Sequence, residues 1–126
     1  MAYVFDPASP EANTPLMKQY LKLKAEAPGA ILFFRMGDFY EVFGPDAEEA
    51  APILSVTLTA RNSKSENPIP MAGVPFHSIT GYIQKLLGAG KKVCIAEQMQ
   101  DPDTVKGLVD RQIVRTFTPA INFELS

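Results

Sequence analysis

The chain has 126 residues and a mass of 13.8 kDa, which supports one ordinary domain and leaves little room for two. Apolar residues make up 46% and charged residues 21%, as in folded globular proteins, and no apolar run approaches the roughly 20 residues that span a bilayer. The net charge of −2 argues against autonomous DNA binding, because phosphate neutralisation by Lys and Arg supplies most of that affinity. With one cysteine, Cys94, and no secretory signal, we expect a cytoplasmic protein without disulfides or a multi-cysteine zinc site.

The N-terminal third predicts a helix followed by a buried strand. Residues 1–13 show no periodicity and form an irregular lead-in, after which Thr14 and Pro15 have the residue types of an N-cap and a first helical position. Apolar residues at helical spacing continue this helix until the segment 27–29, Ala-Pro-Gly, ends it. The apolar run 31–34 then predicts a buried strand.

A second strand is predicted at 39–43, joined to the first by a hairpin at Gly37-Asp38. Because side chains alternate along a strand, Phe39 and Glu41 would share the face opposite Tyr40. The rest of the chain is expected as helix 46–51, bent or shortened by Pro52, strand 55–60, loop 61–70 with its exit 71–75, helix 78–87, strand 91–96, connector 101–107 and strand 112–117. The fold class is α+β with an α/β-like alternation, a mixed sheet of about five to six strands with about three packed helices.

Catalytic chemistry finds little support in the residue spacing. The segment 88–92, Gly-Ala-Gly-Lys-Lys, lacks both the first glycine and the Ser or Thr of a phosphate-binding loop. We interpret Cys94 as a buried thiol and His77, the only histidine, as a loop or capping residue. Asp38 and Glu41 would point to opposite faces of a strand, so no carboxylate cluster for a metal-dependent nuclease can be assembled.

The pair Phe39 and Glu41 allows two interpretations. In the structural one, Phe39 joins the core with Phe43, and Glu41 sits at an exposed strand end. In the functional one, an aromatic wedge and a polar reading group lie side by side on a rigid element next to a turn.

Motifs spread along the chain carry a family resemblance. They occur in this order: 14–20 (TPLMKQY), 34–41 (FRMGDFYE), 68–77 (PIPMAGVPFH), and 96–98 (AEQ) with Asp101-Pro102, Lys106-Gly107 and Arg111. In these motifs the chain closely resembles the N-terminal, mismatch-recognition domain of the bacterial MutS family of DNA mismatch-repair proteins. The resemblance covers residues 14–119.

The resemblance implies a mixed sheet surrounded by helices and a Phe-x-Glu motif that enters the minor groove of DNA. On this basis Phe39 would stack on a mispaired or unpaired base, and Glu41 would hydrogen-bond to it. Matching of the family motifs also implies DNA contacts for Arg61, Met71 and Arg111. No catalytic residue, metal site or cofactor is implied for this segment.

The resemblance implies further properties for full-length members of the family. They are expected to bind ATP and Mg²⁺ in later domains, to dimerise, to work with MutL and to associate with the nucleoid. Residues 120–126 would begin a linker to the next domain. Here the sequence departs from the family, because Ala120-Ile121-Asn122 stands where Gly and then Thr are usual.

A binding module of another class is the alternative: a scaffold domain of the same fold that docks onto other proteins. An acidic stretch at 38–49 and a basic stretch at 56–95 would provide its surfaces. If the mismatch-recognition reading holds, the net charge predicts that the isolated chain binds DNA only weakly at physiological salt.

Overall fold

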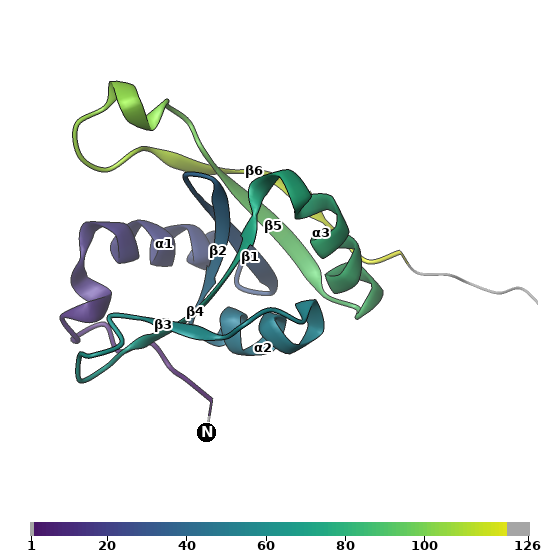
Figure 1. The fold of residues 1–126 in the computed structure, drawn as a ribbon, viewed down its shortest axis with the longest axis horizontal. Coiled ribbons are helices and arrows are strands. Elements are labelled where there is room, and N and C mark those ends of the chain that lie inside the picture. The colour runs from purple at the N-terminus through teal and green to yellow at the C-terminus, as the bar shows by residue number, and fades with distance from the viewer. Residues whose placement is uncertain (1, 121–126) are drawn as a thin grey trace, which may run out of the picture.

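The fold is a six-stranded mixed sheet, described for residues 2–120 by a computed structural model (Figure 1). The strand order is β3-β4-β2-β1-β5-β6, in which β1 and β5 run parallel and all other neighbours run antiparallel. The strands are β1 (Ala30–Met36), β2 (Phe39–Phe43), β3 (Thr59–Arg61), β4 (Ile69–Pro75), β5 (Lys92–Gln98) and β6 (Arg111–Phe117), and the helices are α1 (Pro15–Glu26), α2 (Pro45–Leu54) and α3 (Ile79–Gly88).

The helices cover the two faces of the sheet unequally. On one face, α2 and α3 pack over a core that includes Tyr40 and Val42 of β2. On the other, α1 is the only one of the three helices that packs over Phe34 and Phe43, together with Tyr3 and Phe5 of the N-terminal segment, and Figure 1 shows α1 on the side of the strands opposite α2 and α3. We call these the two-helix face and the α1 face. The cover on the α1 face is incomplete, because Phe39 at the start of β2 is exposed.

Most predicted elements are confirmed. Helix α1 begins after Thr14, whose hydroxyl accepts a hydrogen bond from the Met17 N–H at 3.2 Å. The hairpin turns at Gly37-Asp38 between β1 and β2, as expected, and α3 and β5 lie within two residues of their predicted positions. The mixed α+β class is also confirmed. The predicted linker lies outside the described residues except for Ala120.

The prediction for residues 55–75 is wrong in two places. The strand expected at 55–60 is reduced to β3, because Ser55 adopts a left-handed conformation with φ of 56° and ends α2. The segment 71–75, expected as a loop exit, belongs to β4, which lies between β3 and β2 in the sheet. Proline and glycine within β4 concealed it, since both are unfavourable in strands.

Helix boundaries differ in smaller ways. Helix α2 continues two residues past Pro52, so the proline does not end it. Ser78 precedes α3 as expected, but its side chain makes no capping hydrogen bond, and a 3₁₀ turn over Phe76–Ser78 leads into the helix instead.

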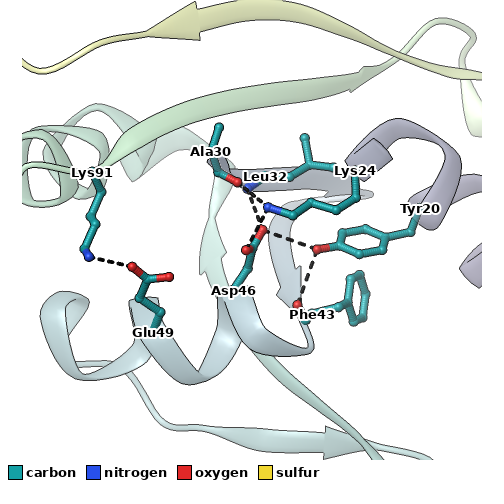
Figure 2. A network of polar contacts seen from close by, with 8 residues as sticks. All are labelled: Tyr20, Lys24, Ala30, Leu32, Phe43, Asp46, Glu49 and Lys91. Carbon is teal, nitrogen blue, oxygen red and sulfur yellow. Dashed lines mark hydrogen bonds and ion pairs between the residues drawn. The ribbon is translucent and has the colours of Figure 1, made fainter. Parts of the chain in front are cut away.

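A buried carboxylate joins α1, β1 and α2 (Figure 2). Asp46, in the first turn of α2, accepts hydrogen bonds from the Lys24 ammonium and the Leu32 backbone N–H, each at 2.9 Å. The Tyr20 hydroxyl lies 3.4 Å from the same carboxylate and 3.3 Å from the Phe43 carbonyl oxygen. Burial raises the pKa of Asp46, although the Leu32 N–H and the Lys24 ammonium act in the opposite direction.

The Leu32 N–H needs this partner. The pairing of β1 with β2 covers only Phe34 to Met36, so Leu32 lies outside the paired part of β1, near the end of β2 at Phe43. A buried backbone N–H without an acceptor costs about 1–3 kcal/mol. Asp46 therefore completes the hydrogen bonding of β1 at the point where β2 ends.

We predict that Asp46→Ala lowers the free energy of unfolding by about 3 kcal/mol, because it leaves the Lys24 ammonium without its carboxylate partner and the Leu32 N–H without its acceptor. Asp46→Asn should lose less, since its amide oxygen can still accept from Leu32. The control is Glu49→Ala, on the same helix, whose exposed pair with Lys91 should contribute under about 1 kcal/mol. Urea unfolding measures all three variants, and equal losses for Asp46→Ala and Glu49→Ala would contradict the prediction.

Candidate nucleic-acid interface

The α1-face side chains of β2 become more buried along the strand, from Phe39 to Phe43. Phe43 is fully buried among the rings of Tyr20 and Phe34, with ring centroids 5.0 and 6.2 Å away. Glu41 is half-buried, and Phe39 is 47% exposed at the start of the strand. The cover provided by α1 therefore ends before Phe39, so the structural interpretation that placed Phe39 in the core is wrong.

Three hydrogen bonds fix the turn that precedes Phe39. Gly37 has φ of 61°, a conformation that favours glycine, and its N–H donates to the Gln98 side-chain oxygen of β5 at 2.9 Å. Arg35 Nε donates to the Gly37 carbonyl oxygen at 2.5 Å. The Phe76 N–H donates to the Asp38 carbonyl oxygen at 2.9 Å. Phe39 thus projects from a fixed backbone.

On the two-helix face, a charged network supports the same turn. The Arg35 guanidinium pairs with Glu97 of β5 at 2.9 Å and lies 4.1 Å from the centroid of the Phe76 ring. The other Glu97 carboxylate oxygen accepts from the Tyr40 hydroxyl at 2.5 Å. This contact links β2 to β5 across β1, and it raises the pKa of Tyr40 together with burial, which is the larger cause.

Glu41 lies between Phe34 of β1 and Gly73 of β4, its partners in the sheet register. Its Oε2 atom is buried and has no hydrogen-bond partner among residues 2–120. Burial raises the pKa of Glu41 above its ordinary value of 4.5, and no other cause contributes. The carboxyl group is therefore the polar group on β2 with unused hydrogen-bonding capacity, next to an exposed aromatic ring.

The remaining three predicted site residues also belong to the α1 face. Directly opposed residues of paired strands share a face, so Met71 lies on the side of its partner Phe43, and Arg61 on the side of its partner Ile69. Arg111, in β6, lies over the ring of Phe34 at 4.6 Å from its centroid. The fold thus brings all five residues to one face, with Phe39 and Glu41 at its centre and Arg61 and Arg111 on opposite edge strands.

The two arginines differ in how far they are engaged. Arg111 is 8% exposed; its Nε donates to the Arg35 carbonyl oxygen and its Nη1 to the Gln19 side-chain oxygen, each at 2.7 Å. Burial lowers its pKa. Arg61 is half-buried, and its Nε has no hydrogen-bond partner in the described part of the chain. Arg111 holds α1 and β1 together, whereas the Nε donor of Arg61 is buried without an acceptor.

Sequence reasoning missed the residues that support this site. Gly73 lies directly against the Glu41 carboxyl group, and Arg35 and Gln98 hold the turn before Phe39. A glycine inside a strand often marks a close approach of another group, so Gly73 carried a usable signal once its segment is taken as a strand. The roles of Arg35 and Gln98 depend on the parallel pairing of β1 with β5, which no local pattern indicates.

Among residues 2–120, no three His, Cys, Asp or Glu side chains lie close enough together to hold a metal ion. None of the helices in this described part is long and apolar enough to cross a membrane.

Comparison with known proteins identifies the family of the chain. A model of the family described as MutS domain I matches residues 14–125. The chain belongs to the MutS domain I family. It is 56% identical over 106 residues to the DNA mismatch repair protein MutS of Staphylococcus carnosus and 54% identical over 111 residues to that of Desulfitobacterium hafniense. These matches cover 84% and 88% of the chain but only 12% and 13% of the relatives, so the chain spans about an eighth of their length.

The environment of Glu41 in this MutS domain I gives a test by pH. An acid whose pKa is raised in the folded state stabilises the fold below its unfolded pKa and loses that contribution as the pH rises through the folded value. We predict that Glu41→Gln is more stable than the parent at neutral pH and that the difference disappears below pH 4.5.

Thermal unfolding at the two pH values measures this difference. Glu66→Gln, in the exposed loop between β3 and β4, is the matched control and should follow the parent at both. A Glu41→Gln variant that is no more stable than the parent at neutral pH would show that the carboxylate is not held in an unfavourable environment.

Proposed function

We propose that this MutS domain I is the mismatch-recognition module of a DNA mismatch-repair protein and reads mispaired or unpaired bases through the minor groove. One observation carries the proposal: an exposed Phe39 stands beside a half-buried Glu41 with an unpartnered oxygen, on a strand whose other face is locked into the core. The family membership supports the same reading.

Phe39 would act as a wedge between base steps. Inserting an apolar side chain costs a few kcal/mol in lost base stacking, and the cost is lowest where pairing is already weak. Stacking of the exposed base on the ring returns about 1–3 kcal/mol. The domain would therefore select sites by the ease of deforming them, with little need to read a particular sequence.

Glu41 would provide discrimination more than affinity. A carboxylate about 4 Å from a phosphate is repelled by roughly 1 kcal/mol even in water. A hydrogen bond involving a charged group returns about 1.5–3 kcal/mol, so the two effects largely offset each other. Ionised Glu41 could accept from a thymine ring N–H, and protonated Glu41 could donate to a purine ring nitrogen; its raised pKa favours the second state.

The other predicted contacts would flank this pair. Arg61, half-buried on the edge strand β3, is suited to a phosphate through the outer part of its guanidinium, because its Nε atom is buried. Arg111 could contact a phosphate only through Nη2, because Nε and Nη1 are engaged within the domain. Met71, half-buried on the same face, would contact the groove wall.

The domain would work as part of a longer protein. Its net charge of −2 is unsuited to gripping the DNA backbone, so other domains would supply the phosphate contacts. We place ATP and Mg²⁺ binding, dimerisation and the interaction with MutL in those other domains, and the proposed setting is the nucleoid of the cytoplasm.

The test is Phe39→Ala in a mismatch-repair protein that carries this chain as its domain I. We predict that binding to a mismatched duplex weakens about 5- to 150-fold while binding to a matched duplex changes little, because stacking contributes about 1–3 kcal/mol and is available only where a base can be exposed. Competition binding with labelled duplexes measures both affinities.

The matched control is Leu58→Ala, which truncates an apolar side chain of the same 47% exposure in the connector between α2 and β3. It should leave both affinities unchanged. An equal loss of affinity for the two duplexes after Phe39→Ala, or no loss for either, would contradict the wedge role of Phe39 and favour the scaffold alternative.

A further inference from the structure

Gly73 lies directly against the Glu41 carboxyl group. The two residues are opposed in the register of β2 and β4, on the α1 face. A Cβ atom placed on Gly73 would lie 2.5 Å from Glu41 Oε2, 2.6 Å from Oε1 and 2.7 Å from Cδ. Carbon atoms in proteins pack against neighbours at about 3.5–4.0 Å, so these positions exclude each other.

Backbone conformation does not explain this glycine. Gly37, Gly44, Gly90 and Gly107 have positive φ angles between 61° and 83°, whereas Gly73 does not. Of the four glycines with an ordinary φ, only Gly73 has any heavy atom within 4 Å of a Cβ placed on it, the others being Gly29, Gly81 and Gly88. The absence of a side chain at Gly73 therefore leaves a space, and the Glu41 carboxyl group occupies it.

The atoms in that space belong to the end of a flexible side chain. The three nearest atoms to the added Cβ are all in the Glu41 carboxyl group, and none belongs to the backbone. A methyl group at position 73 would therefore leave the sheet in place and move the carboxyl group. It would take Glu41 out of the buried position where Oε2 lies without a partner.

We propose that Gly73 is a specificity-determining position that sets where the Glu41 carboxyl group meets a base. The inference rests on the proposed function, because it assigns Gly73 a role only through Glu41. Without a side chain at 73, the carboxyl group lies low against β4, beside Phe39 and partly shielded from water. With one, the group is displaced from that position and from the shielding that favours its protonated form.

A double-mutant cycle tests the proposal in a mismatch-repair protein that carries this chain as its domain I. The quantity measured is the ratio of affinities for mismatched and matched duplexes, in the parent, Gly73→Ala, Glu41→Ala and the double variant. We expect Gly73→Ala and Glu41→Ala each to lower the ratio by about tenfold, the value of one charge-assisted hydrogen bond. In the Glu41→Ala background, Gly73→Ala should have no further effect, since residues that act through one group are not additive.

The outcomes separate the two proposals. If Glu41→Ala leaves the ratio unchanged, the proposed role of Glu41 fails, and the role of Gly73 fails with it. If Glu41→Ala lowers the ratio but Gly73→Ala does not, or if the two effects multiply in the double variant, only the inference about Gly73 is overturned.

Folding provides the control. Gly81→Ala places the same methyl group on an exposed glycine of α3 with no atom within 4 Å, and it should leave the ratio unchanged. Thermal unfolding should show Gly73→Ala folded. If that variant is unfolded, the double variant with Glu41→Ala must recover the fold, because the nearest obstructing group has been removed; failure to recover it would overturn the inference.

Discussion

Strand β2 can occupy only one orientation in the sheet, because Tyr40 and Val42 are buried under α2 and α3 and a shift by one residue would expose both. The same alternation forces Phe39 and Glu41 onto the α1 face. There the single helix covers Phe43 but not Phe39. An exposed ring and a half-buried carboxyl group are thus held in a fixed relation by core residues on the far side of the sheet.

This arrangement places an energetically unfavourable group, the half-buried Glu41 carboxyl group, at the proposed functional site. A buried carboxyl oxygen without a partner, as in Glu41, opposes folding. Functional sites commonly lower the stability of a fold because their residues are selected for activity. A base with a complementary hydrogen-bonding edge would supply the hydrogen-bond partner that the Glu41 carboxyl group lacks in the free domain.

The sequence predicted those parts of the molecule that local patterns determine. The N-cap at Thr14, the hairpin at Gly37-Asp38 and the alternation of β2 depend on neighbouring residues, and they are confirmed. Strand β4 was missed because Pro70 and Gly73 oppose strand formation locally, while pairing with β2 and β3 overrides them. The Phe39-Glu41 pair was found by spacing, but its support from Gln98 and Gly73 depends on long-range pairing between strands.

The central claim is that Phe39 stacks on a base only where pairing is defective. The most direct measurement uses 2-aminopurine, whose fluorescence responds to stacking, placed at a mispaired position and, in a second duplex, at a paired one. For a mismatch-repair protein that carries this domain, we predict a fluorescence change on binding at the mispaired position that Phe39→Leu abolishes, and no change at the paired position. The same change with Phe39→Leu, or an equal change in the paired duplex, would contradict the account.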